Sequence, residues 1–245
     1  MNENTNGRKV ALVTGANKGI GYEIAAGLGA LGWLVGVGAR DEQRRADAVA
    51  ALRDRGADAF GVPLDVSDDD SVAAAAALLT ERHGRLDVLV NNAAVTGGMP
   101  QEPTGVDLAE LRAVLETNVL GVIRVTNTFL PLLRRSAAPR IVNMSSAVGS
   151  LALQSDPDAF TGPTSAAYAP SKTLLNAVTV QYAKELRDTG ILINLACPGY
   201  CDTDLNGHRG TRTPARGAAI AVELATLPDG GPTGRFFNED GPLPW

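Results

Sequence analysis

The stretch "TGANKGIG", Thr14 to Gly21, decides the fold of this chain. It follows the β-branched apolar run "KVALV" and opens a helical pattern that begins at Gly19. Glycines at these positions allow a tight turn at Gly15, a close approach of the backbone at Gly19 and close packing of helix on strand at Gly21. The amide groups that begin such a helix point at anions. Strand, turn and helix in this order therefore predict a dinucleotide-binding loop.

Short apolar runs alternate with longer helical patterns along the whole chain. The predicted strands span residues 9–15, 33–40, 57–66, 86–94, 140–146, 191–199 and 234–240. The predicted helices span residues 19–32, 41–56, 67–84, 108–133, 165–188 and 214–226. We expect Ser67 to cap the third helix, with Asp70 completing a capping box. This order predicts a single-domain α/β Rossmann fold, a doubly wound parallel sheet of about seven strands with helices on both faces.

Composition limits the class of protein. The chain has 245 residues, 44% hydrophobic and 20% charged, which is typical of a globular protein with a sizeable core. We expect one domain over residues 8–245, after a disordered polar lead at residues 1–7. A formal charge of −5 disfavours a nucleic-acid partner, and no apolar run reaches the roughly 20 residues of a membrane span. The polar start lacks the apolar core of a signal peptide, so a cytoplasmic location is expected.

Metal and hydrolase sites find little support in the sequence. Two cysteines, Cys197 and Cys201, are too few for a disulfide scaffold or a zinc site, so no metal is expected. The two histidines, His83 and His208, do not lie beside a nucleophile elbow. We therefore expect no hydrolase triad.

Further motifs follow the later strands, where ligands of such sheets bind. They are "NNA" at Asn91–Ala93, "TNVLG" around Asn118, "MSSAVG" after the fifth strand, "YAPSK" from Tyr168 to Lys172, and "PG" at Pro198–Gly199. Together with the glycine loop, this ordered set resembles the short-chain dehydrogenase/reductase family over residues 8–245. The stretches "GAR" and "TGRFFNEDGPLPW" are most similar to its NADPH-dependent carbonyl reductase branch. The resemblance implies an oxidoreductase that reduces a ketone or aldehyde to an alcohol.

The end of the second strand selects the cofactor. An NAD enzyme would place an acidic residue there to bind the ribose, but this chain has Ala39 and Arg40. A guanidinium suits a 2′-phosphate, so NADP(H) is predicted. The resemblance implies that Asn17, Lys18 and Arg40 surround this phosphate. The alternative is that Asp41 faces the ribose.

The resemblance also implies the remaining cofactor contacts. Asp65 would bond the adenine amine, although it could instead be a loop or cap carboxylate, and Thr203 would contact the carboxamide or pyrophosphate unless it only caps a helix. The full predicted set is Gly15, Asn17, Lys18, Gly19, Ile20, Gly21, Arg40, Asp65, Val66, Asn91, Ala93, Tyr168, Lys172, Pro198, Gly199 and Thr203.

"YAPSK" supplies the predicted catalytic group. A free tyrosine has a pKa of about 10, and a lysine four residues on lies on the same helical face, where it can stabilise the phenolate. We expect Tyr168 to be the general acid or base and Lys172 to lower its pKa. The resemblance implies that Ser146, with Ser145 as the alternative, bonds the substrate oxygen. It also implies that Asn118 holds a water behind Lys172, unless Asn118 only bonds a backbone carbonyl.

Two segments depart from the family pattern. Residues 150–167, "SLALQSDPDAFTGPTSAA", form a long predicted loop before Tyr168, and "DLNGHRGTRTP" after Thr203 predicts a small lid and an open pocket. The substrate is expected to be a small molecule, and the chain a dimer, a tetramer or a monomer. The alternatives to reduction are oxidation of a secondary alcohol in the reverse direction and a non-catalytic NADP sensor.

Overall fold

The computed structural model describes residues 7–98, 100–159 and 162–245, so the predicted lead, except for Gly7, lies outside the described residues. The strands are β1 (Val10–Thr14), β2 (Leu34–Ala39), β3 (Asp58–Pro63), β4 (Val88–Asn91), β5 (Arg140–Met144), β6 (Leu192–Ala196), β7 (Phe236–Asn238) and β8 (Gly241–Pro242). The α-helices are α1 (Gly19–Ala30), α2 (Glu42–Asp54), α3 (Asp69–His83), α4 (Leu108–Leu115), α5 (Gly121–Leu133), α6 (Leu151–Ser155), α7 (Tyr168–Glu185) and α8 (Pro214–Ala225). Short turns of other helix types are η1 (Pro103–Gly105), η2 (Glu116–Leu120), η3 (Ala147–Gly149) and η4 (Asp204–Asn206).

One sheet, in the order β3-β2-β1-β4-β5-β6-β7-β8, runs through the molecule. β1 to β7 pair in parallel, and the two-residue β8 adds an antiparallel edge that was not predicted. The strand order reverses between β1 and β4, which opens a crevice beyond their carboxyl ends. The predicted Rossmann fold is confirmed, and the crevice lies where its ligands are expected.

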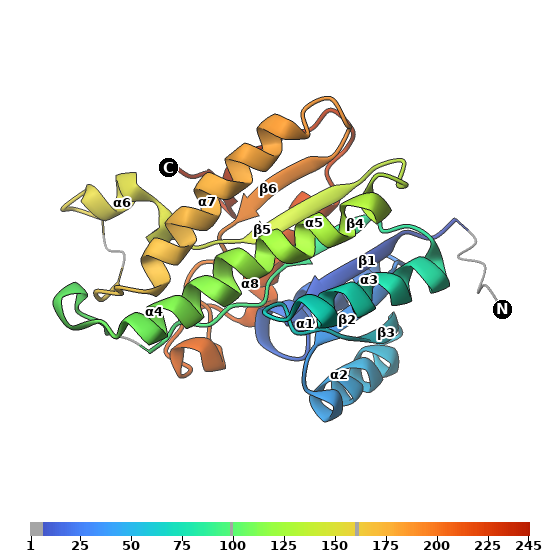
Figure 1. The fold of residues 1–245 in the computed structure, drawn as a ribbon, viewed down its shortest axis with the longest axis horizontal. Helices are drawn as coiled ribbons and strands as arrows, with labels where there is room; N and C mark the ends of the chain where they lie inside the picture. The colour runs from blue at the N-terminus through green and yellow to red at the C-terminus, as the bar shows by residue number, and fades with distance from the viewer. Residues whose placement is uncertain (1–6, 99, 160–161) are drawn as a thin grey trace.

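Helices cover both faces of the sheet. One buried cluster joins α1, α2 and α8 to the sheet through residues such as Ile24, Leu52 and Ile220. The other joins α3, α5 and α7 through residues such as Leu79 and Phe129. Figure 1 shows α3, α5 and α7 side by side on the near face. Burial on both sides explains why every residue of β1, β2, β4, β5 and β6 is buried.

The predicted helix at residues 108–133 is helical throughout but is not one α-helix. η2 is a π-type turn between α4 and α5, and it contains Asn118, which is fully buried. Such turns widen a helix locally and are frequent at functional sites. Here the turn contacts α7, and Asn118 within it donates to Ser171 near the start of that helix.

Three local predictions were wrong. Asp68, not Ser67, caps α3 by accepting from the Ser71 amide at 2.7 Å, because Ser67 is bonded to Asp65 instead. α7 begins three residues later than predicted, at Tyr168. The segment 150–167, predicted as loop, contains the short helix α6, whose first turn is capped by the Ser150 hydroxyl.

Among the described residues, no helix is both long and apolar enough to cross a membrane. The cytoplasmic location stays a prediction.

The buried carboxylate of Asp87 connects several segments at the amino-terminal ends of β1 and β4. It accepts from the Val10 amide at 2.7 Å and the Ser136 hydroxyl at 2.5 Å, and it pairs with Arg85 at 3.2 Å. Asp87→Ala would leave these donors without an acceptor, so we expect a loss of about 2–4 kcal/mol in the free energy of unfolding, measured by urea denaturation. The exposed Asp54→Ala is the control and should change stability by less than about 0.5 kcal/mol. Equal stability of Asp87→Ala and wild type would contradict this assignment.

Candidate active site and cofactor groove

A cavity of about 720 Å³ lies at the carboxyl ends of β1 to β4. Eleven of the predicted cofactor residues line it: Gly15, Asn17, Lys18, Gly19, Ile20, Gly21, Arg40, Asp65, Val66, Ala93 and Thr203. The other predicted cofactor residues, Asn91, Tyr168, Lys172, Pro198 and Gly199, do not line it. The cavity is therefore a groove of the size of a nucleotide, with the predicted catalytic group outside its walls.

The glycine loop has the backbone that was predicted for it. Gly15 and Gly19 have φ values of +65° and +56°, a region that favours glycine. A Cβ at Gly21 would lie 2.4 Å from the Asn92 side-chain nitrogen and 2.5 Å from the Gly15 carbonyl oxygen. Gly21 is therefore required for the helix to start this close to the strands.

The beginning of α1 is free to bind an anion. Lys18 at its N-cap makes no side-chain cap hydrogen bond, and its first turn contains no acidic residue. Helix amides without intrahelical partners attract phosphate. The first residues of α1, Gly19 to Gly21, line the groove, so their amides lie at its wall. The cradle of glycines and amides fits the pyrophosphate of a dinucleotide.

The end of β2 carries positive charge into the groove. The Arg40 side chain is 74% exposed and lies 3.7 Å from the Asp65 carboxylate. Asp41 caps α2 by accepting from the Arg44 amide at 2.8 Å, which commits its carboxylate and disfavours the alternative role on the ribose. Arg44 also lines the groove and was missed. Its place four residues after Arg40, in the first turn of α2, is the signal that could have found it.

Asp65 is held as an anion in the groove. Burial alone would raise the pKa of Asp65, but hydrogen bonds from Ser67 and the nearby Arg40 charge keep it below its ordinary value. The Ser67 hydroxyl donates to this carboxylate at 2.6 Å, and the Ser67 amide donates at 3.0 Å. An ionised carboxylate at this point can accept a hydrogen bond from an exocyclic amine.

The loop after β6 forms the opposite wall. Thr203 caps η4 and also lies against the glycine loop, because a Cβ at Gly19 would be 3.5 Å from its methyl carbon. Thr203 is therefore both a helix cap and a residue of the groove wall, and its contact with the cofactor stays a prediction.

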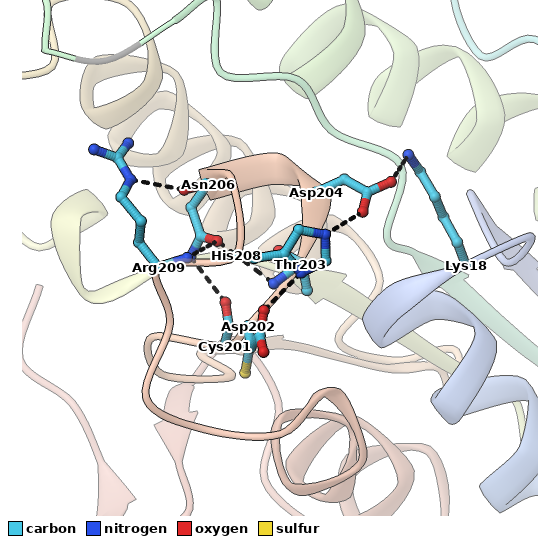
Figure 2. Close-up of polar contacts among 8 residues, drawn as sticks. All are labelled: Lys18, Cys201, Asp202, Thr203, Asp204, Asn206, His208 and Arg209. Carbon is cyan, nitrogen blue, oxygen red and sulfur yellow. Dashed lines mark hydrogen bonds and ion pairs between the residues drawn. The ribbon is translucent and has the colours of Figure 1, made fainter.

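A chain of charged groups ties this loop to the start of α1, as Figure 2 shows. The Lys18 ammonium pairs with Asp204, and the His208 ring bridges Asp202 at 2.7 Å and Asp204 at 2.8 Å. The hydrogen bonds that the ring donates to Asp202 and then to Asp204 raise the pKa of His208. Among the described residues, His208 is the only one other than glycine with positive φ, at +60°. Sequence reasoning placed His208 in a polar loop but missed this bridge.

Asn91 lies elsewhere than predicted. Its side chain joins a buried polar ladder, donating to the Asn143 carbonyl oxygen at 2.8 Å and to the Thr126 hydroxyl at 3.1 Å. The next residue, Asn92, lines the groove instead. Successive side chains of a strand point to opposite faces, which explains the exchange.

Ser146 and Tyr168 meet outside the groove. The Ser146 hydroxyl lies close enough to Tyr168 to lower the pKa of its phenol, and Tyr168 is the first residue of α7. The alternative, Ser145, is buried and donates to the Asn176 side-chain oxygen at 2.6 Å, so it is committed to α7. The geometry favours Ser146.

Lys172 is buried behind Tyr168. Its ammonium donates to the Met144 carbonyl oxygen at 2.8 Å and lies 5.5 Å from the centre of the Tyr168 ring. Burial lowers the pKa of Lys172 to about 8. Burial also raises the pKa of Tyr168, with the nearby Cys197 adding to the effect and the Ser146 hydroxyl opposing it. The protein groups alone therefore raise the pKa of Tyr168, whereas Lys172 was predicted to lower it.

The Asn118 side chain joins the loop after β4 to α7. Its side chain accepts from the Val95 amide and donates to the Val95 carbonyl, both at 2.9 Å, and donates to the Ser171 hydroxyl at 3.0 Å. This is the backbone bonding that was the alternative to its predicted role. The water relay stays a prediction.

Pro198 and Gly199 follow β6, and Gly199 has a φ of +74°. A Cβ there would lie 2.7 Å from the guanidinium of Arg212, which pairs with Glu239 at 2.7 Å.

Cys197 and Cys201 are buried and free, and burial raises the pKa of both thiols. Within the described ranges there is no cluster of three or more acidic, histidine or cysteine residues that could hold a metal ion.

Known proteins are similar to this chain along almost its whole length. The short chain dehydrogenase family matches residues 9–213. The short-chain dehydrogenase anuI of Penicillium roqueforti is 35% identical, with 96% of each chain covered. Carbonyl reductase (NADPH) 1 of Rattus norvegicus is 33% identical, with 97% of this chain and 99% of that protein covered. The crystal structure of an NADPH-bound carbonyl reductase from chicken fatty liver has a TM-score of 0.86 at 29% identity, covering 97% of this chain and 99% of that one.

A family match over residues 9–213 extends from the first strand to the start of α8, so it includes every groove-lining residue except Pro214 and every predicted catalytic residue. The two relatives, at 35% and 33% identity, continue the likeness to 96% and 97% of the chain. The chain belongs to the short-chain dehydrogenase/reductase family.

Proposed function

We propose that the protein is an NADPH-dependent reductase of ketones or aldehydes. The observation that carries the proposal is the meeting of Ser146, Tyr168 and the buried Lys172 at the ends of β5 and α7, beside a groove with phosphate-binding features. The relatives named as carbonyl reductases support this choice of reaction.

The residues of the groove fit NADP(H). The glycine loop and the start of α1 would hold the pyrophosphate, and Asp65 the adenine amine. Three cations, Lys18, Arg40 and Arg44, line the groove and would neutralise a 2′-phosphate. When bound, the cofactor supplies the hydride.

The protein groups supply the proton and hold the substrate oxygen. Tyr168 donates its phenolic proton to the carbonyl oxygen as that oxygen becomes an alcohol. Ser146 donates a second hydrogen bond, which stabilises the developing negative charge. Lys172 carries a positive charge below a pH of about 8 and lies close enough to Tyr168 to stabilise the phenolate left behind.

Removing the phenolic hydroxyl tests the acid. Tyr168→Phe should lower kcat by at least about 10³-fold, because general acid catalysis and the fixed position of the acid are both lost. NADPH binding, followed by fluorescence titration, should stay within about twofold. The control is Tyr182→Phe on the same helix, whose hydroxyl bonds Asn127 at 2.6 Å and which should keep full activity. A fully active Tyr168→Phe enzyme would sink the mechanism.

Charge at the end of β2 tests the cofactor preference. The double variant Arg40→Leu/Arg44→Leu should raise the KM for NADPH about 10- to 100-fold and leave that for NADH nearly unchanged, because only NADPH carries the 2′-phosphate. The exposed Arg187→Leu should alter neither KM. Equal losses with both cofactors would instead mean that the two arginines only support the fold.

The buried lysine predicts a pH effect on stability. The pKa of Lys172 is about 8 in the folded chain and 10.5 ordinarily, so between these values the folded state releases a proton that the unfolded state keeps. Wild type should therefore gain about 2 kcal/mol of stability over Lys172→Met between pH 7 and pH 9.5. Urea denaturation at several pH values measures this difference, with the exposed Lys184→Met as the control. A pH-independent difference would show that Lys172 keeps its ordinary pKa.

A further inference from the structure

The segment that leads into Tyr168 is paired with a distant loop. Gln101, between β4 and α4, forms a parallel bridge with Ser165. Its amide donates to the Thr164 carbonyl at 2.9 Å, and its carbonyl accepts from the Ala166 amide at 3.2 Å. The long segment before the catalytic helix is therefore fixed, over its last residues, to the loop that follows β4.

The Gln101 side chain extends this pairing to the helix itself. Its carbonyl oxygen accepts from the Ala167 amide at 3.1 Å, and its amide nitrogen donates to the Gly97 carbonyl. Ala167 is the N-cap of α7, is fully buried, and has no side chain that could cap a helix. Gln101 supplies from another segment the acceptor that the N3 side chain of a capping box would provide for the N-cap amide, and Pro170 at N3 has no such acceptor.

The same loop holds Tyr168 from its other side. The Ser171 hydroxyl donates to the Tyr168 carbonyl at 2.6 Å and accepts from Asn118 at 3.0 Å. Asn118 in turn binds both backbone groups of Val95. The backbone before and after the tyrosine is thus attached, through Gln101 and Asn118, to one short loop.

Glycine at position 97 makes this arrangement possible. Gly97 has a φ of +71°, and a Cβ there would lie 2.8 Å from a Val114 methyl carbon and 3.3 Å from the Gln101 amide nitrogen. Gly97 also lines the cofactor groove, together with Val95 and Thr96. The loop is therefore a wall of the groove on one side and the support of the catalytic helix on the other.

We propose that Gln101 is a positioning residue that fixes the Tyr168 hydroxyl relative to Ser146 and Lys172. The proposal rests on the proposed function, in which Tyr168 is the acid. The first residue of a helix tends to fray, because its first amides lack intrahelical partners. A shift of about 1 Å in a catalytic group can cost about 100-fold in rate, so an acid placed there needs an external anchor.

Gln101→Met tests the proposal at nearly constant side-chain volume. It removes both side-chain hydrogen bonds, and we expect kcat to fall about 10- to 100-fold. The Kd for NADPH should stay within about twofold, because Gln101 does not line the groove. Hydrogen exchange of the Ala167 amide should become faster. Gln43→Met is the control, since the Gln43 side chain bonds only Asp47 on the exposed surface of α2 and should leave kcat unchanged.

A shorter side chain separates positioning from folding. Gln101→Asn keeps the amide but is one methylene too short to reach both Gly97 and Ala167, and its kcat should fall at least about fivefold. If Gln101→Met does not fold, this variant decides, and a wild-type kcat overturns the proposal. A kcat loss matched by an equal loss of NADPH affinity would also overturn it. An active Tyr168→Phe refutes the proposed function, whereas an inactive Tyr168→Phe with a fully active Gln101→Met refutes only the role of Gln101.

Discussion

The joint between β1 and β4 is the constraint on which the rest of the molecule depends. The Thr14 hydroxyl accepts from the amides of Asn92 and Ala93 at 2.9 and 3.0 Å, and the Asn92 side chain donates to the Thr14 carbonyl at 2.9 Å. These bonds hold two strand ends together where the strand order reverses. Gly21 has no side chain at this point, so α1 can begin against the joint. The groove is the space that this arrangement leaves open.

Polar groups that are costly to bury lie together behind the predicted catalytic residues. The ladder from Asn91 through Asn143 to Thr179 crosses from β4 to α7, and Lys172 is bonded to the end of β5. A buried ammonium has to be held by surrounding acceptors, and burial already lowers its pKa. These hydrogen bonds therefore fix the position of α7 against the sheet.

Local patterns explain what could be predicted from the sequence. The strand, glycine loop and helix at Thr14–Gly21 form one continuous segment, and the Tyr168–Lys172 spacing is a property of a single helix. The missed features involve distant segments. Arg44 enters the groove only because α2 starts beside it, and the His208 bridge depends on how a turn after Thr203 folds back. Ser67 was expected as a cap because the sequence did not show that Asp65 would take its hydroxyl.

The π turn at η2 connects the loop that lines the groove to α7, the helix that begins at Tyr168. A regular helix over residues 108–133 would present its side chains at an even spacing of about 100°, whereas the wider turn buries Asn118 between the loop after β4 and α7. The side-chain amide of Asn118 then bonds Val95, which lines the groove, and Ser171. Ser171 in turn donates to the Tyr168 carbonyl. Three hydrogen-bonded links, from Val95 to Asn118, from Asn118 to Ser171 and from Ser171 to the Tyr168 carbonyl, therefore join the groove wall to the tyrosine. The groove and the predicted acid Tyr168 therefore share one support, and the local irregularity of the helix creates it.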